Sequence, residues 1–558
     1  MKDSRRKFLK AGVLTSLGGI LPLKNIAQPL SISIQNNPNL SAVSDTISIL
    51  QTTDVHCQIH PHDELFWENN QLTFRQAGGY AHVAGLINGV RKANPNTIVI
   101  DTGDMFQGSE LSDKTQGDAL VPILNEINYD VYTPGNWEVI FYKQKMQQLL
   151  GALKAPKVCA NMFHDKGDGT PGELIFQPYQ TIVKLGIKIG FLGYTDHLVP
   201  RRQPPALSKG IVYTKPDENI EHYVKVLKEQ EQCEFIIILS HLGLSQQIAL
   251  ANNPACEGVD YIFGGDTHER IRKPIQCTYA KVVEPGAFSS FVGRLDLKVK
   301  NGKIIHETYE LIEVKPEVYP ADKKVAKIIK KFEKPYLDSI NEILGYSTIP
   351  LYRNFVIENT MDTLVIDALK WKTGVDIALS NGFRFCPPRV PNEDGLVPIT
   401  QGYLFDMLPV NSPVRMGKIK GDMIVPWLER ELENVFAKEA SRRFGGWVVK
   451  FRGMELEFYG FKPLGEKVAK VTIGGEPIDP DKDYTVCACE RDGDPEDAIC
   501  RMRNVRDTYS ADYTLHDAMR AYLKAHSPVT PTPKGSIKIL DGDSQLLSQV
   551  WGVDYQFT

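Results

Sequence analysis

The sequence lacks an excess of positive charge, a long apolar run and any CxxC pair of cysteines. Its 64 Lys and Arg residues are outnumbered by 68 Asp and Glu, and the net charge of −4 argues against nucleic acid as a partner. The apolar stretch 11–23 is too short and too rich in glycine to predict a transmembrane helix, so we expect no stable membrane insertion. Because the nine cysteines include no CxxC pair, a zinc ribbon is excluded.

The first 27 residues have the architecture of a twin-arginine export signal. Arg5 and Arg6 precede Phe8-Leu9-Lys10, a short apolar run and the small residue Ala27. A basic amphipathic N-terminus of a cytosolic protein is the alternative interpretation. We expect residues 1–27 to be a signal peptide and the protein to reach the periplasm through the twin-arginine pathway, which carries folded proteins.

The remaining chain predicts two α/β domains. From about Thr46, short β-rich runs that end in polar or glycine residues alternate with helical patterns such as residues 81–93. This alternation is typical of a layered α/β domain, in which chemistry collects at the carboxyl ends of the strands. The expected segments are a first domain at 46–315, a charged linker helix at 316–345, a second domain at 346–540 and a tail at 541–558.

Polar side chains follow five of the predicted strands in the first domain. Carboxylates, amide oxygens and imidazoles are ligands of hard and borderline cations, and two ions need one group that bridges them. A single Asp-x-His at a strand end is common in ordinary loops, whereas five such ends in succession predict a metal centre. They are Asp54-Val55-His56, Gly103-Asp104, Gly135-Asn136, His241 and Asp266-Thr267-His268.

This order of motifs resembles the calcineurin-like metallophosphoesterases of the 5′-nucleotidase family. The resemblance implies a four-layer αββα metallophosphoesterase domain followed by a 5′-nucleotidase-like α/β substrate domain, and a hydrolytic water activated by two divalent ions. Carried over by motif, the ligands of one ion are Asp54, His56, Asp104 and His268, and Asp104 bridges to a second ion held by Asn136, His241 and Asp266.

One of these ligands departs from the family pattern, which has histidine where this chain has Asp266. Aspartate adds a negative charge and favours harder ions. We therefore expect two Mn²⁺ ions, with Zn²⁺ or Mg²⁺ as the alternatives.

The loop Gly135-Asn136-Trp137-Glu138 also departs from the family, which carries a histidine acid where this chain has Trp137. The aspartate that orients this acid is replaced by Ile140. An indole donates a hydrogen bond but cannot protonate an alkoxide leaving group. A sulfur leaving group is a weaker base and needs no acid, so the loop favours cleavage of a bond to sulfur. The alternative is a weak phosphatase in which Trp137 only packs.

Several stretches resemble the thiosulfohydrolases of the bacterial Sox system (the SoxB type), which carry Trp-Glu in this loop. These stretches are residues 78–86, 379–385, 490–501 and 514–531, although the SoxB type has histidine at the positions of Asn136 and Asp266. The resemblance implies release of sulfate from a cysteine S-sulfonate on a SoxYZ-like sulfur carrier protein.

Both branches of the family place an arginine on a small anionic substrate, and Arg384 matches it, with Asn381 shaping the same loop. We therefore name Trp137 and Arg384 as the catalytic residues and Asn381 and Arg384 as the substrate-binding residues. Tyr403 and Phe405 lie in a region suited to stacking a nucleobase, but no aromatic residue offers the second ring. The alternatives to the sulfohydrolase are a 5′-nucleotidase or 2′,3′-cyclic phosphodiesterase, and a binding module without catalysis.

Overall fold

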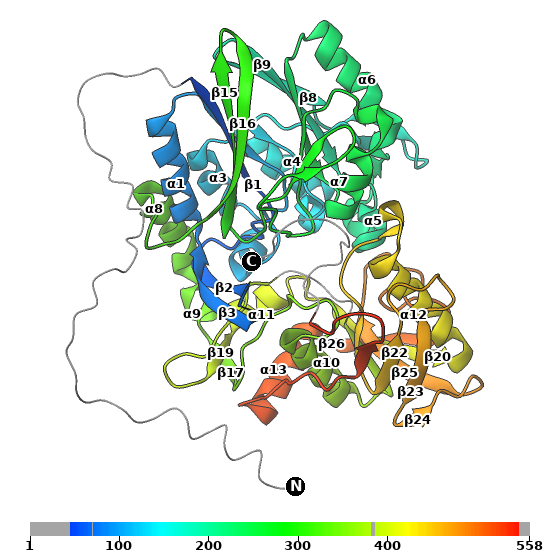
Figure 1. The fold of residues 1–558 in the computed structure, drawn as a ribbon. Helices are drawn as coiled ribbons and strands as arrows, with labels where there is room; N and C mark the ends of the chain where they lie inside the picture. Colours follow the sequence, from blue (N-terminus) through cyan, green and yellow to red (C-terminus); the bar gives the residue numbers. More distant parts are fainter. Residues whose placement is uncertain (1–44, 70, 381–385, 546–558) are drawn as a thin grey trace, which may run out of the picture. The chain divides into compact units, whose positions relative to one another are not determined.

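The computed structural model describes residues 45–69, 71–380 and 386–545 (Figure 1). The predicted export signal at 1–27 lies outside these residues, as do Asn381 and Arg384. Among the helices that the structure describes, none is long and apolar enough to cross a membrane.

The first half of the chain builds two β-sheets whose parallel strands end at the metal-ligand motifs. One sheet has the order β16-β15-β1-β4-β5 and the other the order β13-β14-β12-β11-β9-β8. In the first sheet the strands are β1 (Thr46–Thr52), β4 (Thr97–Asp101), β5 (Val131–Tyr132), β15 (Phe291–Lys300) and β16 (Lys303–Glu313). In the second they are β8 (Tyr179–Lys184), β9 (Ile187–Thr195), β11 (Phe235–His241), β12 (Tyr261–Phe263), β13 (Ile275–Gln276) and β14 (Lys281–Val283).

The two sheets pack face to face and carry helices on their outer faces (Figure 1). Between the sheets, Ile49 and Ile98 of the first share one apolar core with Phe191 and Ile237 of the second. The first sheet is covered by α1 (Tyr80–Ala93), α3 (Leu120–Ile127), α4 (Tyr142–Ala152) and α8 (Lys323–Glu333), and the second by α6 (Ile220–Lys225) and α7 (Leu244–Ala251). Strands buried on both faces read as continuous apolar runs, which is the pattern seen in the sequence. The predicted αββα layering is confirmed.

Shorter elements complete this half. They are a hairpin of β2 (Pro61–Glu68) and β3 (Gln71–Gly78), a sheet of β6 (Met162–Asp165), β7 (Pro171–Leu174) and β10 (Ile211–Tyr213), and the helices α2 (Glu110–Thr115) and α5 (Val199–Arg202).

The second half is also α/β, as predicted, and centres on a five-stranded sheet of order β21-β18-β25-β20-β26. Its strands are β18 (Ile377–Ser380), β20 (Pro413–Lys420), β21 (Lys450–Arg452), β25 (Asp483–Cys489) and β26 (Arg506–Thr514). The helices are α10 (Thr360–Thr373), α11 (Gln401–Met407), α12 (Gly421–Phe436) and α13 (Leu515–His526). A smaller sheet contains β22 (Met454–Phe458), β23 (Val468–Ile473), β24 (Glu476–Pro477) and β27 (Ile537–Ile539).

The segment between the two halves, 316–345, contains α8, the short helix α9 (Leu337–Ile340) and the start of β17 (Ile343–Ser347), which pairs with β19 (Val397–Thr400). Asp322 caps α8 by accepting hydrogen bonds from the backbone N–H groups of Lys324 and Val325. Val325 and Ile329 are buried in the core of the first half. This charged helix therefore packs on the first domain with its apolar side.

Candidate metal centre

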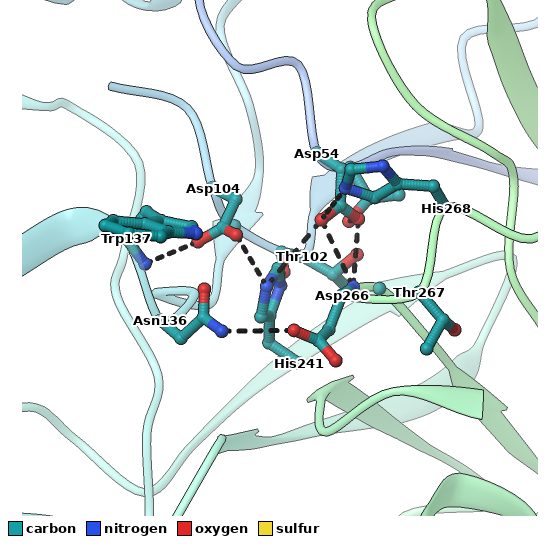
Figure 2. Close-up of polar contacts among 12 residues, drawn as sticks. Asp54, Thr102, Asp104, Asn136, Trp137, His241, Asp266, Thr267 and His268 are labelled. Atoms are coloured by element: carbon teal, nitrogen blue, oxygen red, sulfur yellow. Dashed lines mark hydrogen bonds and ion pairs between the residues drawn. The ribbon is translucent and has the colours of Figure 1, made fainter. Parts of the chain in front are cut away.

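The seven predicted ligands lie at the carboxyl ends of strands from both sheets. Figure 2 labels all of them except His56. From the first sheet, Asp54 and His56 follow β1, Asp104 follows β4 and Asn136 follows β5. From the second sheet, His241 ends β11, and Asp266 and His268 follow β12. Since the parallel strands of each sheet point the same way, motifs far apart in the sequence meet at one edge.

Two carboxylates form the middle of the cluster. Asp54 Oδ1 lies 3.9, 3.7 and 3.3 Å from the Nε2 atoms of His56, His241 and His268. Asp104 Oδ2 lies 3.8 Å from His56 Nε2 and 3.1 Å from His241 Nε2. Among the described residues, two sets have their ligand atoms within 4.8 Å of one another, namely Asp54, His56 and His268, and Asp54, Asp104 and His241. Asp54 is common to both sets, and Asp104 belongs to one set but also lies near His56 of the other, so both carboxylates lie between the two candidate sites.

Hydrogen bonds on the far side of two imidazoles fix their orientation. His56 Nδ1 lies 2.8 Å from Gln107 Oε1, and His241 Nδ1 lies 2.5 Å from the Thr102 carbonyl oxygen. Because a carbonyl oxygen only accepts, each Nδ1 carries a proton, and each ring directs its Nε2 at the cluster. Nε2 is therefore the atom through which each of these two rings can bind a metal ion.

Lone pairs face one another in the middle of this cluster. His241 Nε2 and Asn136 Oδ1 are buried and accept no hydrogen bond among the described residues. The Nε2 atoms of His56 and His268 are 3.1 Å apart. Buried acceptors in this arrangement are costly unless a cation lies between them. The donor set of carboxylate, amide oxygen and imidazole therefore fits divalent ions of the Mn²⁺ or Zn²⁺ type.

Burial and the charges of neighbouring ligands shift the pKa values of Asp54, Asp104 and His56. Burial raises the pKa of Asp104 to about 8, against the opposing attraction of His241. For Asp54, burial would raise the pKa, but the nearby imidazoles of His241 and His268 outweigh it and hold the pKa below its usual range. Burial, with repulsion from His268, lowers the pKa of His56 to about 3. A neutral His56 is thus maintained throughout the physiological pH range.

The backbone at these positions is strained. Asp54, His56, Asp104, Asp266 and His268 have positive φ angles between 49° and 85°. Non-glycine residues seldom adopt this conformation, which costs of order 1–3 kcal/mol each and persists only where the surroundings enforce it. Such strain at most of the predicted ligands is typical of a functional site.

The loop that contains Trp137 contacts the centre through its backbone. The Trp137 N–H donates a hydrogen bond of 2.7 Å to Asp104 Oδ1 (Figure 2). Gly135 allows this approach, because a Cβ atom there would lie 2.3 Å from the same oxygen. The Trp137 side chain is 7% exposed. Its position therefore depends on the centre as well as on the apolar core.

Glu138, which the sequence analysis did not single out, anchors this loop. Its Oε1 accepts hydrogen bonds from the Met105 N–H at 3.1 Å and from the Tyr132 hydroxyl at 2.5 Å. Glu138 is fully buried. Glu138 thereby connects the loop after β4 to β5. The only indication of this role in the sequence was its position directly after Trp137.

Asp266 has a different environment from the other predicted ligands. Its Oδ1 accepts a hydrogen bond of 3.0 Å from Asn136 Nδ2, and its Oδ2 accepts one of 3.0 Å from Arg202. Arg202, at the end of α5, also pairs with Asp196 at 3.2 Å. Asp266 belongs to neither of the two sets of clustered ligand atoms among the described residues. Nothing in the sequence pattern pointed to Arg202 or Asp196.

A cavity beside the centre is lined by both halves of the chain. Trp137 and Arg202 come from the first half, and Leu379, Ser380 and Arg491 come from the second. Arg491 donates a hydrogen bond of 2.9 Å to the backbone oxygen of Arg201, so the two halves are in contact at its edge. The predicted substrate residues Asn381 and Arg384 follow Ser380 in the sequence and lie outside the described residues.

Comparison with known protein families agrees with this geometry. Residues 47–270 match the calcineurin-like phosphoesterase family, and residues 340–490 match the 5′-nucleotidase C-terminal domain family. The chain belongs to the calcineurin-like metallophosphoesterases of the 5′-nucleotidase type. It is thus a metal-dependent hydrolase of this family, with residues suited to a dinuclear site.

Individual relatives of this metallophosphoesterase are distant. The sulfate thiohydrolase SoxB of Thermus thermophilus superposes with a TM-score of 0.80 at 21% identity, covering 91% of this chain and 99% of that one. A 5′-nucleotidase precursor of Thermus thermophilus gives 0.76 at 22% identity, covering 89% and 100%. The trifunctional nucleotide phosphoesterase YfkN of Bacillus subtilis is 24% identical over 502 residues, or 81% of this chain, which spans about a third (33%) of that protein's length. At these identities the structural likeness shows the shared fold.

Proposed function

We propose that this metallophosphoesterase is an exported sulfohydrolase of the SoxB type. It would use water to cleave the bond between the two sulfur atoms of a cysteine S-sulfonate on a carrier protein, giving sulfate and a free thiol. The observation that supports this proposal is Trp137, which lines the cavity where the family has its histidine acid. A thiolate is a much weaker base than an alkoxide and leaves without being protonated.

The described residues that line the rest of the cavity offer neither a histidine nor an unpaired carboxylate as a substitute acid. Among the described lining residues there is no histidine, and the carboxylate of Glu490 is paired with Arg415 at 2.9 Å. Ile140, where the family has its orienting aspartate, packs against the apolar core. The described part of the site therefore suits a leaving group that departs as an anion.

Bound divalent ions would supply Lewis acidity and a nucleophilic water. On the family pattern, the residues that would hold them are Asp54, His56, Asp104 and His268 for one ion, and Asn136, His241 and Asp266 with the shared Asp104 for the other. Mn²⁺ is the ion we propose for both sites. Arg384 would bind the sulfonate oxygens through its planar fork, with Asn381 shaping the loop.

A nucleotide phosphoesterase is the second candidate, because nucleotide-cleaving proteins are among the distant relatives. The two rings considered for base stacking argue against it. Tyr403 and Phe405 are only 1% and 6% exposed. Tyr403 donates a hydrogen bond of 3.2 Å to the Pro387 oxygen, and Phe405 packs edge-on against His516. Neither is available to clamp a base in this conformation.

A direct comparison of substrates tests the proposal. Purified mature protein with Mn²⁺ is given an S-sulfonated cysteine at the end of a flexible peptide, and in parallel AMP and 2′,3′-cyclic AMP. We expect sulfate release to exceed both phosphate release from AMP and ring opening of 2′,3′-cyclic AMP to a nucleoside monophosphate, and the Asp104→Ala variant to abolish all three. Efficient AMP hydrolysis with no sulfate release would establish the nucleotidase instead.

The proposed location is the periplasm, and the proposed partner is a small SoxYZ-like sulfur carrier. Export rests on the sequence of residues 1–27. Replacing Arg5 and Arg6 together by lysine should retain the protein in the cytoplasm, as measured by cell fractionation. Equal amounts in the periplasm with and without the change would argue against the twin-arginine route.

A further inference from the structure

Asp266 stands where the family pattern has a metal-binding histidine, and both of its oxygens are engaged by protein donors. Oδ1 accepts from Asn136 Nδ2 at 3.0 Å (Figure 2), and Oδ2 accepts from Arg202 at 3.0 Å. The other carboxylates of the centre differ, since Asp54 Oδ1 and Asp104 Oδ2 are directed at imidazole Nε2 atoms. Asp266 therefore differs from Asp54 and Asp104, because its carboxylate accepts hydrogen bonds from Asn136 and Arg202.

Arg202 is held firmly in this position. Its side chain is 12% exposed and lies between Asp196 and Asp266, which are 1% and 6% exposed. Its guanidinium also lies 5.4 Å from the centre of the Phe444 ring. A buried cation between two buried carboxylates is a costly arrangement to disturb, because removing it leaves unpaired charge.

The contact with Asp266 also decides which way the Asn136 amide faces. Because Nδ2 donates to Asp266, the amide oxygen Oδ1 is directed elsewhere, and it is buried without a donor among the described residues. An amide oxygen is the atom of asparagine that binds a cation. The chain Arg202–Asp266–Asn136 therefore presents Oδ1 to the site of the second ion.

We propose that Asp266 acts from outside the coordination sphere, where Arg202 holds its carboxylate and the carboxylate orients Asn136 toward the second ion. Asp104, Asn136 and His241 are then the protein ligands of this ion, one fewer than the family pattern provides. The second ion therefore binds more weakly than the first, and Arg202 is a positioning residue for it. The inference concerns the metal centre and holds for either candidate substrate.

The competing arrangement makes Asp266 a direct ligand for which Arg202 competes. The two arrangements predict opposite effects of weakening the contact between Arg202 and Asp266. If Asp266 orients Asn136, weakening the contact between Arg202 and Asp266 lowers the affinity of the protein for the second ion. Residues that hydrogen-bond to a metal ligand typically raise the metal affinity by about 10–100-fold. If Asp266 is a ligand, releasing its carboxylate leaves the affinity unchanged or raises it.

Calorimetric titration of the metal-free protein with Mn²⁺ tests whether Asp266 orients Asn136 or is itself a metal ligand. Arg202→Lys keeps the charge but shortens the side chain, so it loses the Nη1 group that contacts both carboxylates. Arg201→Lys is the matched control, since Arg201 is exposed and pairs with neither carboxylate. We expect two ions of unequal affinity in the wild type, about 10-fold weaker binding of the second in Arg202→Lys, and no change in the control. Unchanged or tighter binding in Arg202→Lys, or a single ion in the wild type, overturns the proposal.

A crystal structure of the wild type with Mn²⁺, located by anomalous scattering, provides an independent measurement. The proposal expects every Asp266 oxygen to lie beyond coordination distance of both ions. An Asp266 oxygen bound to either ion refutes it. This measurement decides the question even if Arg202→Lys fails to fold.

Discussion

Restoring a general acid at position 137 should increase the activity of this metallophosphoesterase on phosphate esters. Trp137 precedes a short 3₁₀ helix, Glu138–Phe141, and the Ile140 N–H donates to the Trp137 carbonyl at 3.0 Å. In such a turn, residues three apart lie on the same side. A histidine at 137 and an aspartate at 140 would therefore be neighbours, with the imidazole beside the cavity that the indole lines.

The double substitution should change both the activity on AMP and the stability of the fold. A positioned general acid contributes typically about 10²–10⁴-fold, so Trp137→His/Ile140→Asp should raise kcat/KM for AMP by that order. The loss of a buried indole should lower the free energy of unfolding by about 3 kcal/mol. The S-sulfonate substrate gains nothing, because its thiolate leaving group needs no proton.

The assay measures phosphate release from AMP and sulfate release from an S-sulfonated peptide, with bound Mn²⁺ equalised by elemental analysis. Trp137→Phe/Ile140→Asp is the control, since it keeps an aromatic ring without an acidic proton. Rapid AMP hydrolysis by the wild type, or no gain in the histidine variant at equal metal content, would refute the assignment of Trp137 to sulfur chemistry.

Further predictions concern the centre and its surroundings. Asp104→Ala should reduce bound metal to less than one ion per chain by elemental analysis, and two retained ions would contradict its shared role. Arg384→Ala should lower kcat/KM by the equivalent of roughly 1.5–3 kcal/mol, and an unchanged value would remove it from the substrate site. Glu138→Gln should destabilise the fold by about 1–3 kcal/mol in urea unfolding, whereas Tyr132→Phe, its matched control, should cost less. Burial raises the pKa of Asp406 from 3.8 to about 6. Its ionised form therefore destabilises the fold progressively as pH rises through this range, so Asp406→Asn should raise Tm at pH 7.5 but not at pH 4. An equal shift at both values would contradict the argument.

The sequence was sufficient to predict the layers and the region where the ligands meet. Strands such as β1 are buried on both faces and so read as continuous apolar runs, and each ends in a residue with a distinctive donor group. Because parallel strands point their carboxyl ends the same way, Asp54 and Asp104 had to lie near each other once the strands were identified. The structure adds His241 and His268 from the second sheet to the same cluster.

Contacts between loops could not be predicted in this way. Arg202 and Asp266 are 64 residues apart, and neither lies in a periodic pattern that fixes its direction. Tyr403 and Phe405 illustrate a related limit. Their sequence position suggested a stacking surface, but α11 is buried on the sides that carry both rings. Burial of an aromatic side chain depends on tertiary packing, which local sequence does not encode.

The strand order of the first sheet has a consequence for synthesis of the protein. β1 lies between β4, which begins at Thr97, and β15, which pairs with it through contacts such as Thr46 with Lys298. The second sheet is encoded entirely between these two partners. A growing chain therefore cannot close the first sheet until β15, which ends at Lys300, has left the ribosome, and pairings this distant in sequence form slowly. Until then the ligands of the two sheets have no rigid frame to hold them together, so ion capture should be a late event that marks a finished domain.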